Sequence, residues 1–254
     1  MGVRTRPLGL LADVHANLQA LDAALAWLEE RGAEPIYCMG DVVGYGGDPA
    51  ACVERIRETC AATVRGNHDA AVVDPALREW FNPHARAAIE RQAELLDDDA
   101  MGWLASLPAT VEGEESGVWL AHSGFADPDA FEYVTGARAA GVELDALAER
   151  GARWGFLGHT HVRSGWRRDG GGVETLRLPA DGEVDLDGEG PYLVNPGAVG
   201  QPRDRDPRAA VAAFDPDHAR LSLARLEYDL EGAQRAIRES GMPDFEARRL
   251  ASGR

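Results

Sequence analysis

Lysine is missing from the sequence, because all 26 basic residues among the 254 are arginine. A catalytic Schiff base needs a lysine amine, so enzymes of that type, including those that use pyridoxal phosphate, are excluded. The phosphate-binding P-loop is excluded for the same reason, since its lysine contacts the phosphates. Chemistry that depends on a lysine side chain therefore plays no part in the function.

Cysteine and long apolar runs are scarce as well. Cys38, Cys52 and Cys60 are odd in number, and their spacing matches neither a metal-binding nor a redox motif. We expect them to be buried free thiols in a reducing cytosol, which predicts a cytoplasmic protein. No run of about 18 apolar residues occurs, so the sequence predicts no membrane-spanning helix.

The charge is strongly unbalanced, because 43 acidic residues face 26 basic ones and leave a net charge of -17. A nucleic-acid backbone requires a basic surface, so we expect no stable nucleic-acid partner. A small phosphorylated substrate is compatible, because a bound metal ion inverts the local potential. With 44% hydrophobic residues the chain can form one large core. We expect a single domain over residues 1–240, followed by a frayed polar tail at 241–254.

The first part of the chain alternates between apolar runs and helical patterns. Pro7 to Ala12, Pro35 to Met39 and Ala61 to Arg65 are short apolar segments that predict buried strands. Leucines at helical spacing from Leu18 to Leu28 follow the first strand, and a helix from about Pro49 to Thr59 follows the second. This alternation predicts a parallel sheet whose strand ends open on one rim, where open α/β sheets bind ligands.

The remainder of the chain changes from helical to strand-rich. A helical pattern covers residues 74–107, and we expect either a small insertion over the rim or a plain pair of packing helices. Strands at Val118 to Ala121 and Arg153 to Leu157 flank a helix from about Ala137 to Glu149, and a last helix is expected at Leu230 to Ser240. Short runs bounded by Gly, Pro and Asp predict further strands at Val162 to Arg168, Val173 to Leu178, Tyr192 to Asn195, Ala209 to Phe214 and Leu221 to Leu226.

Polar side chains gather at the predicted strand ends. Five of the seven histidines lie there, whereas His84 falls in the helical segment and His218 in an acidic turn. Two pairs in this set are spaced two residues apart, and extended backbone would project both members of such a pair to the same side. The set consists of Asp13, His15, Asp41, Asn67, His68, His122, His159 and His161.

The number of candidate ligands favours two metal ions over one. Two carboxylates, an amide oxygen and four imidazoles suit two divalent transition-metal ions, with Mn expected first and Fe, Ni, Co or Zn as alternatives. A single zinc ion would need only three or four of them. Two such ions typically lie about 3.5–4 Å apart and share a solvent ligand. The charges of two divalent ions, two carboxylates and a bridging hydroxide sum to about +1. A site with this net charge suits an anionic phosphoryl group.

At this point the order of the motifs carries a resemblance. Asp13-x-His15, Gly40-Asp41, Gly66-Asn67-His68-Asp69, His122 and Gly158-His159-x-His161 together resemble the calcineurin-like metallophosphoesterases. The match extends from about Leu8 to His161. Residues 195–203 are also similar to a segment of small bacterial members regarded as phosphodiesterases or protein-phosphatase-like proteins.

The resemblance implies a four-layer α/β/β/α sandwich of two mixed sheets. The strands of the C-terminal part would belong to the second sheet. It implies a metal-dependent phosphoester hydrolase whose metal-bridging hydroxide attacks phosphorus. His68 would bind no metal, but would protonate the leaving oxygen or stabilise the transition state. In the implied ligand sets, Asp13, His15 and His161 bind one metal, Asn67, His122 and His159 bind the other, and Asp41 bridges them.

The sequence departs from the family at one place. Eukaryotic-type protein phosphatases carry an Asp and an Arg where Gly44 and Tyr45 stand here, so we prefer a phosphodiesterase or small-molecule phosphatase to a protein phosphatase. We expect Gly44 and Tyr45 to form a wall facing the phosphate. Asp69 is the nearest carboxylate that could orient His68 instead, or it braces the loop. Candidate phosphate-binding arginines are Arg65, Arg86, Arg138 and Arg203.

Other readings stay open. Singly, Asp13 and Asp41 are compatible with helix caps or turns, and His122 with a core histidine. A dinucleoside polyphosphate hydrolase is possible within the same chemistry. A scaffold module that binds metal without turnover, or a hydrolase of an ester or amide bond, would use the same residues differently.

Overall fold

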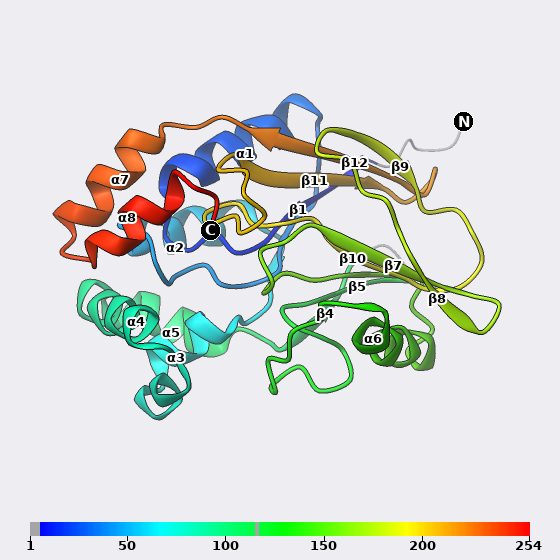
Figure 1. Cartoon of the computed structure of the whole chain (residues 1–254), viewed down its shortest axis with the longest axis horizontal. Coiled ribbons are helices and arrows are strands. Elements are labelled where there is room, and N and C mark those ends of the chain that lie inside the picture. The colour runs from blue at the N-terminus through cyan, green and yellow to red at the C-terminus, as the bar shows by residue number, and fades with distance from the viewer. Residues whose placement is uncertain (1–5, 115–116) are drawn as a thin grey trace.

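The computed structural model describes residues 6–114 and 117–254, and two six-stranded sheets pack face to face in it (Figure 1). The first five residues of the expected 1–240 domain lie outside the described part. The first sheet has the strand order β3 (Ala62–Thr63), β2 (Ile36–Cys38), β1 (Leu8–Leu11), β11 (Ala209–Asp215), β12 (Arg220–Leu226) and β9 (Gly182–Asp185). The second has the order β4 (Thr110–Glu112), β5 (Val118–Ala121), β6 (Trp154–Phe156), β10 (Tyr192–Asn195), β7 (Ser164–Asp169) and β8 (Gly172–Thr175).

Both sheets are mixed, and helices cover their outer faces. Strands β1, β2 and β3 are parallel, as are β5, β6 and β10, and the remaining pairs are antiparallel. On the first sheet α1 (Leu18–Glu30) packs against β11 and β12, and on the second α6 (Ala137–Glu149) packs against β7, β8 and β10. The predicted α/β/β/α sandwich is therefore confirmed.

The remaining helices lie at one end of the sandwich (Figure 1). The segment between β3 and β4 contains α3 (Asn67–Val73), a 3-10 helix η1 (Pro75–Trp80), α4 (Pro83–Leu95) and α5 (Asp98–Ser106). The others are α2 (Pro49–Thr59), α7 (Leu230–Glu239) and α8 (Asp244–Leu250). Helices α7 and α8, orange and red in Figure 1, pack on each other.

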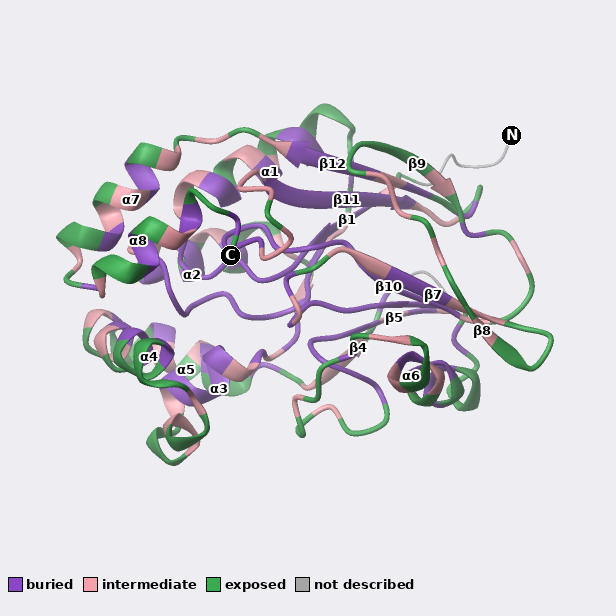
Figure 2. Cartoon of the chain, in the orientation of Figure 1, coloured by how far each residue is buried: buried purple, intermediate pink, exposed green. Residues whose placement is uncertain are grey.

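Strand β1 lies at the centre of the core and is buried on both faces (Figure 2). Leu8 and Leu10 face the second sheet and pack with Phe156 and Phe214, whereas Leu11 faces the helices that cover the first sheet. A strand with apolar contacts on both sides needs a continuous apolar sequence, which explains why this segment lacks a polar–apolar alternation.

The strands of the C-terminal part do not all join the second sheet, so that expectation is wrong. Only β7, β8 and β10 do, whereas β9, β11 and β12 belong to the first sheet. The reason is the free edge of β1, which β11 fills by antiparallel pairing with Leu8 opposite Phe214. Strands β4 and β9 are edge strands that the sequence does not predict, since they are short and partly exposed.

The expectation of a frayed polar tail is also wrong. Helix α8 occupies Asp244–Leu250, and Glu246, Ala247 and Leu250 on it are buried. Ala247 and Leu250 pack in a cluster with Tyr45 and with side chains of α4 and α7. Only three positions of this helix are buried, so most of its residues are polar and the sequence pattern does not indicate a packed helix.

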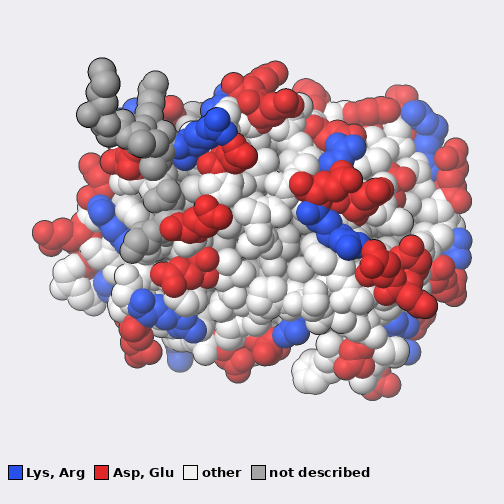
Figure 3. Space-filling view, turned by 180° about the vertical axis from the view of Figure 1, so that it is seen from behind, with Lys and Arg blue, Asp and Glu red and all other residues white. Residues whose placement is uncertain are grey.

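Within the described residues no helix is long and apolar enough to cross a membrane. The three cysteines are free thiols; Cys38 and Cys52 are buried, Cys60 is half-buried, and burial raises the pKa of each. On the face shown in Figure 3, acidic and basic side chains are interspersed, and acidic ones cover the larger area.

Candidate metal centre

The ends of five strands bring the predicted polar residues to one rim of the sandwich. Asp13 and His15 follow β1, Asp41 follows β2, and His122 follows β5 directly. All eight members of the predicted set except Asn67 are at most 4% exposed. Asn67 and His68 begin α3 just after β3, and His159 and His161 lie just after β6.

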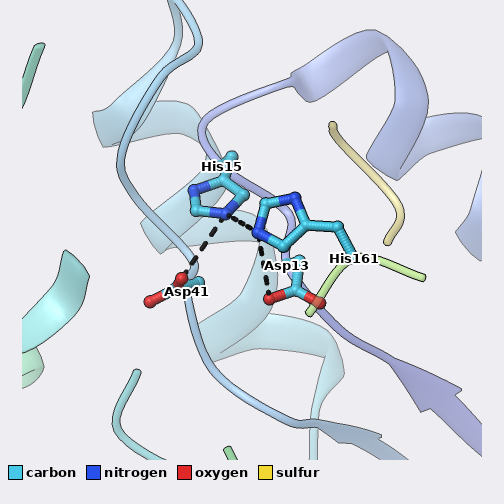
Figure 4. Close-up of side chains that lie close together, drawn as sticks. All are labelled: Asp13, His15, Asp41 and His161. Carbon is cyan, nitrogen blue, oxygen red and sulfur yellow. Dashed lines mark hydrogen bonds and ion pairs between the residues drawn. The ribbon is translucent and has the colours of Figure 1, made fainter. Parts of the chain in front are cut away.

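One group of potential ligands consists of Asp13, His15, Asp41 and His161 (Figure 4). The Nε2 atoms of His15 and His161 are 3.0 Å apart. Nε2 of His161 lies 3.6 Å from Oδ1 of Asp13, and Nε2 of His15 lies 3.4 Å from Oδ2 of Asp41. Four donor atoms from three strand ends therefore surround one point.

A second group consists of Asp41, His122 and His159, with Asn67 beside it. Nε2 of His122 is 3.1 Å from Nδ1 of His159, 3.1 Å from Oδ1 of Asn67 and 3.4 Å from Oδ2 of Asp41. Asp41 is thus common to both groups, and the same oxygen of its carboxylate faces both.

Backbone carbonyl groups fix the orientation of the four imidazoles. Nδ1 of His15 donates to Val43, at 3.0 Å. His122 and His161 use Nδ1 in the same way toward the carbonyl groups of Met39 and Gln201, at 2.7 and 2.6 Å. His159 is reversed, since its Nε2 donates to Phe131 at 2.8 Å and its Nδ1 faces the cluster. Such contacts select the tautomer that leaves a lone pair for a cation.

Burial keeps three of these rings neutral. It holds the pKa of His15 and of His161 well below the ordinary value, and it lowers the pKa of His159 to about 3. Burial would raise the pKa of Asp41, but His122 and other histidines outweigh it and hold this pKa well below its ordinary value. Neutral imidazoles and an ionised carboxylate are the forms that bind a metal ion.

His122 and Asp13 behave differently. Burial would lower the pKa of His122, but the charge of Asp41 outweighs it and raises this pKa to about 9. Burial raises the pKa of Asp13 to about 7. Cation binding to the cluster would therefore release protons from both groups.

Two observations show that the cluster suits a cation. The Nδ1 proton of His15 and that of His161 are both committed to carbonyl groups, so lone pairs face each other across 3.0 Å. Oδ2 of Asp13 is buried and has no hydrogen-bond partner among residues 6–114 and 117–254. Facing lone pairs and an unpaired buried carboxylate oxygen are unfavourable unless a positive charge lies between them. The residues present therefore fit a metal ion.

The backbone at this rim is strained. Five residues of the set have φ values between 47° and 69°, in the left-handed region. Our expectation that the two closely spaced pairs lie in extended backbone is therefore wrong, although both members of each pair do face the cluster. Such conformations cost about 1–3 kcal/mol each and collect at functional sites. The residues are Asp13, His15, Asp41, His159 and His161.

A cavity of about 590 Å³ opens beside the cluster. Its lining includes Leu77, Trp80 and Phe81 from the helical segment and residues 129–133. The helical segment therefore lies over the rim, as one of the two alternatives predicted. Asp41, Asn67, His68, His159 and His161 from the predicted set line the cavity.

Residues 7–218 match the family model described as the calcineurin-like phosphoesterase superfamily domain. The chain belongs to the calcineurin-like phosphoesterases. The resemblance that the motifs predict is thereby confirmed, and with it a phosphoesterase whose clustered Asp and His side chains could bind a metal ion.

Other chains share nearly the whole length of this phosphoesterase. A metallophosphoesterase from Sphaerobacter thermophilus is 35% identical, with a TM-score of 0.83 over 98% of this chain and 99% of that one. An uncharacterized protein from Methanocaldococcus jannaschii is 32% identical over 249 residues, which are 97% of this chain and 98% of that protein. A hypothetical protein from Pyrococcus horikoshii shares the fold at 18% identity, with a TM-score of 0.77 over 98% of each chain.

Asp69 of this phosphoesterase braces the loops instead of orienting His68. Its Oδ2 accepts from the backbone N–H of Asp41 at 2.8 Å and of Gly66 at 2.9 Å, and its Oδ1 accepts from that of Val43 at 3.1 Å. The expectation that it replaces the missing orienting Asp is thus wrong, because its carboxylate accepts hydrogen bonds from backbone N–H groups. Asp41 in turn stabilises the start of α3, since its Oδ1 accepts from the backbone N–H of His68 at 2.9 Å.

Packing holds the ring of His68. Its centroid lies 4.8 Å from that of His15, 4.6 Å from Tyr45 and 4.8 Å from Phe81. Nδ1 of His68 is buried, and no described residue forms a hydrogen bond with it. A Cβ atom on Gly44 would lie 2.9 Å from this nitrogen, so Nδ1 faces Gly44 and the other ring nitrogen, Nε2, is left for a ligand.

Gln92 is a residue of the site that sequence reasoning misses. Its side chain is fully buried; Oε1 accepts from the N–H of Gly44 at 2.5 Å, and Nε2 donates to the carbonyl of Gly46 at 2.8 Å. A signal exists in the sequence, because Gln92 continues the helical spacing of Ala85, Ala88 and Ile89, which are buried as well. A single amide on an apolar helix face must satisfy polar groups inside the protein.

The predicted substrate residues divide into two groups. Tyr45 and Arg203 line the cavity, whereas Gly44 mainly makes room, since a Cβ there would lie 2.3 Å from Nδ1 of His15. Arg65 is not among the lining residues and pairs with Asp129 at the cavity edge, at 2.5 Å.

The remaining candidates lie elsewhere. Arg86 is exposed and pairs with Glu90 on α4, and Arg138 is exposed on α6. As expected, His84 and His218 stay outside the cluster; His84 stacks on Phe245 and His218 pairs with Asp215.

Proposed function

We propose that this phosphoesterase hydrolyses small phosphate esters, as a phosphodiesterase or small-molecule phosphatase, with the help of two divalent transition-metal ions, Mn first among them. The observation that carries the proposal is the position of Asp41. One oxygen of its carboxylate lies 3.4 Å from Nε2 of His15 and 3.4 Å from Nε2 of His122. A carboxylate shared between two groups of donors suits a pair of neighbouring cations.

The two groups define which residues would hold the ions. When bound, the ions would activate water for attack on phosphorus and offset the charge of the phosphoryl group. The protein's part is to keep the donors deprotonated, buried and aimed at common points, which the carbonyl contacts of the imidazoles support. One set is Asp13, His15 and His161, the other is Asn67, His122 and His159, and Asp41 is common to both.

His68 is the residue that would act on the leaving group. It lies against the cluster and lines the cavity, and its Nδ1 faces Gly44. Its Nε2 therefore donates a proton to the leaving oxygen of a bound ester. Burial lowers the pKa of His68 to about 4, and a phosphoryl anion beside the ring counteracts that effect because it favours the charged form.

The cavity supports a small substrate over a phosphoprotein. Aromatic side chains at its mouth offer apolar contacts for an organic ester; Trp80 is 87% exposed there, and Tyr133 stacks on His159 with ring centroids 4.2 Å apart. A volume of about 590 Å³ lies in the range of small-molecule sites. Gly44 and Tyr45 replace the Asp and Arg of the protein phosphatases, which also favours small phosphorylated molecules.

The test is a substrate panel with the Mn²⁺-loaded protein, comparing aryl phosphomonoesters, aryl phosphodiesters and cyclic nucleotides. We expect turnover of at least one class, and a decrease in kcat of about 10²- to 10⁴-fold in His68→Ala with unchanged metal content. His218→Ala is the matched control and should behave like the wild type. Absence of turnover on every substrate would favour a binding module, and loss of metal from His68→Ala would contradict the role of this residue.

A further inference from the structure

Two arginines from distant parts of the chain flank one aromatic ring in the cavity. The Cζ atom of Arg203 lies 5.5 Å from the centroid of the Tyr45 ring, and that of Arg249 lies 5.4 Å from it. All three side chains line the cavity. Arg203 follows β10, whereas Arg249 comes from α8, at the end of the chain.

The positive charge of this pair is only partly compensated. Nη1 of Arg249 lies 3.4 Å from Oε2 of Glu246, whereas Arg203 has no carboxylate within ion-pair distance among the described residues. Arg203 donates to the neutral amide of Gln201 at 3.0 Å, and its Nε is buried with no hydrogen-bond partner in the described part of the chain. Nε of Arg249 also donates to the backbone oxygen of Arg254, at 2.6 Å. Among the described side chains, one carboxylate therefore pairs with Arg249 and none pairs with Arg203. An anion would supply both the missing charge and the missing acceptor.

The pair is held in place before any ligand binds. Helix α8 is anchored through Ala247 and Leu250, which pack with Tyr45 in one apolar cluster. Glu246 is fully buried and also accepts from Gln201, at 3.2 Å. Arginine side chains that are fixed in this way lose little conformational entropy when they bind a phosphate in their planar fork.

The pair lies on the side of the cavity where a leaving group would be. Tyr45 contacts His68, with ring centroids 4.6 Å apart, and His68 is the residue we assign to the leaving oxygen. A group that departs past His68 therefore reaches Tyr45 and the two arginines next.

We propose that Arg203 and Arg249 form a second anion subsite, which selects small substrates that carry two neighbouring phosphoryl groups. This inference rests on the proposed function, because the reacting phosphoryl group would lie at the metal cluster. In the reaction, water adds to the phosphorus there and the bond from that phosphorus to the bridging oxygen breaks. The leaving phosphate takes the electron pair, accepts a proton from His68 and is neutralised by the two guanidinium groups. The attacking water releases one proton to solvent, and His68 regains from solvent the one proton that it donated.

The test compares Arg249→Gln with Arg248→Gln. Arg248 is the neighbouring residue on α8, but its side chain is 67% exposed and pairs with Asp244, which makes it a matched control. Glutamine preserves most of the aliphatic stem that packs near Tyr45. For the Mn²⁺-loaded protein, we expect R249Q to lower kcat/KM for adenosine diphosphate about tenfold or more and that for bis(p-nitrophenyl) phosphate less than about twofold. R248Q should change neither.

A binding measurement keeps the inference separate from the proposed function. Inorganic pyrophosphate is titrated calorimetrically into the protein in the presence of excess EDTA. We expect R249Q, and independently R203Q, to weaken binding about tenfold relative to the wild type and R248Q. Equal affinity in all four proteins, no binding to the wild type, or an equal loss of both activities in R249Q would overturn the subsite. If the wild type binds pyrophosphate in this manner but hydrolyses no ester, the proposed function fails and the anion subsite stands.

Discussion

Replacing Asp69 with asparagine is expected to loosen the metal centre and destabilise the fold without removing any proposed ligand. Asp69 is fully buried, and its carboxylate accepts from the backbone N–H groups of Asp41, Val43 and Gly66. Asparagine has nearly the same shape, so the substitution changes the charge and one acceptor atom only. The experiment therefore isolates the bracing role of the carboxylate from packing.

The expected magnitude follows from these three contacts. Burial and the charge of Asp41 raise the pKa of Asp69 to about 7, so the comparison is made at a pH above this value, where the carboxylate is ionised. A hydrogen bond to a charged group contributes about 1.5–3 kcal/mol. The amide oxygen of asparagine can still serve the two N–H groups that meet at Oδ2, but its NH₂ group then faces the N–H of Val43. One bond is lost and two lose their charge assistance, so we expect the free energy of unfolding to fall by about 2–4 kcal/mol. Because Asp41 loses its backbone support, metal affinity should fall about 10- to 100-fold.

Chemical denaturation and calorimetric metal titration measure the two effects. Asp99→Asn is the control, since Asp99 is an exposed residue paired with Arg57 and its substitution should cost less than about 1 kcal/mol. The reasoning would be refuted if Asp69→Asn kept its stability and metal affinity but lost most of its kcat. That result would show that Asp69 orients His68 after all.

Two further substitutions test the loop beside the cluster. A methyl group at Gly44 would lie 2.3 Å from Nδ1 of His15, so Gly44→Ala should displace that ring. Metal affinity in a calorimetric titration should then fall at least about tenfold. Unchanged affinity would show that the loop moves to accommodate the methyl group without displacing His15. Gln92→Leu leaves the N–H of Gly44 and the carbonyl of Gly46 without their buried partners. It should cost about 2–4 kcal/mol in chemical denaturation, and a loss below about 1 kcal/mol would mean that water replaces the amide.

The positions of the site residues could be predicted because they obey a local rule. Asp41, for example, follows a short apolar run that predicts a strand, and the carboxyl ends of parallel strands meet on one rim. The strand-and-helix pattern that places α6 and β10 is local in the same sense, and both elements occur where the sequence predicts them.

Features that depend on tertiary context could not be predicted from local pattern. The left-handed backbone at Asp13 and His15 exists because the loops around them hold it, and the spacing of the residues does not reveal it. Asp and His adopt this conformation more readily than most residues, and no other local feature of the sequence indicates it. The pairing of β11 with β1 likewise depends on the edge of a strand that is distant in sequence, and the residues near β11 do not indicate it.

The place of Arg249 in the cavity also could not be predicted from local sequence pattern. The segment that contains it is short and rich in charge, and only its packing against Tyr45 gives the residue a place in the cavity. Arg65 is the reverse case: it stands directly before the Gly66-Asn67-His68 motif, yet its guanidinium turns to Asp129. Proximity in sequence to a motif is thus a poor guide to which arginine faces a substrate.

Asp41 is expected to serve two metal sites at once, and the metal content per chain tests this role most directly. After reconstitution with Mn²⁺ and removal of the excess, elemental analysis should find about two ions per wild-type chain and fewer than about one per Asp41→Ala chain. Asp99→Ala should retain the wild-type content. One ion per wild-type chain, or two in Asp41→Ala, would contradict the shared carboxylate.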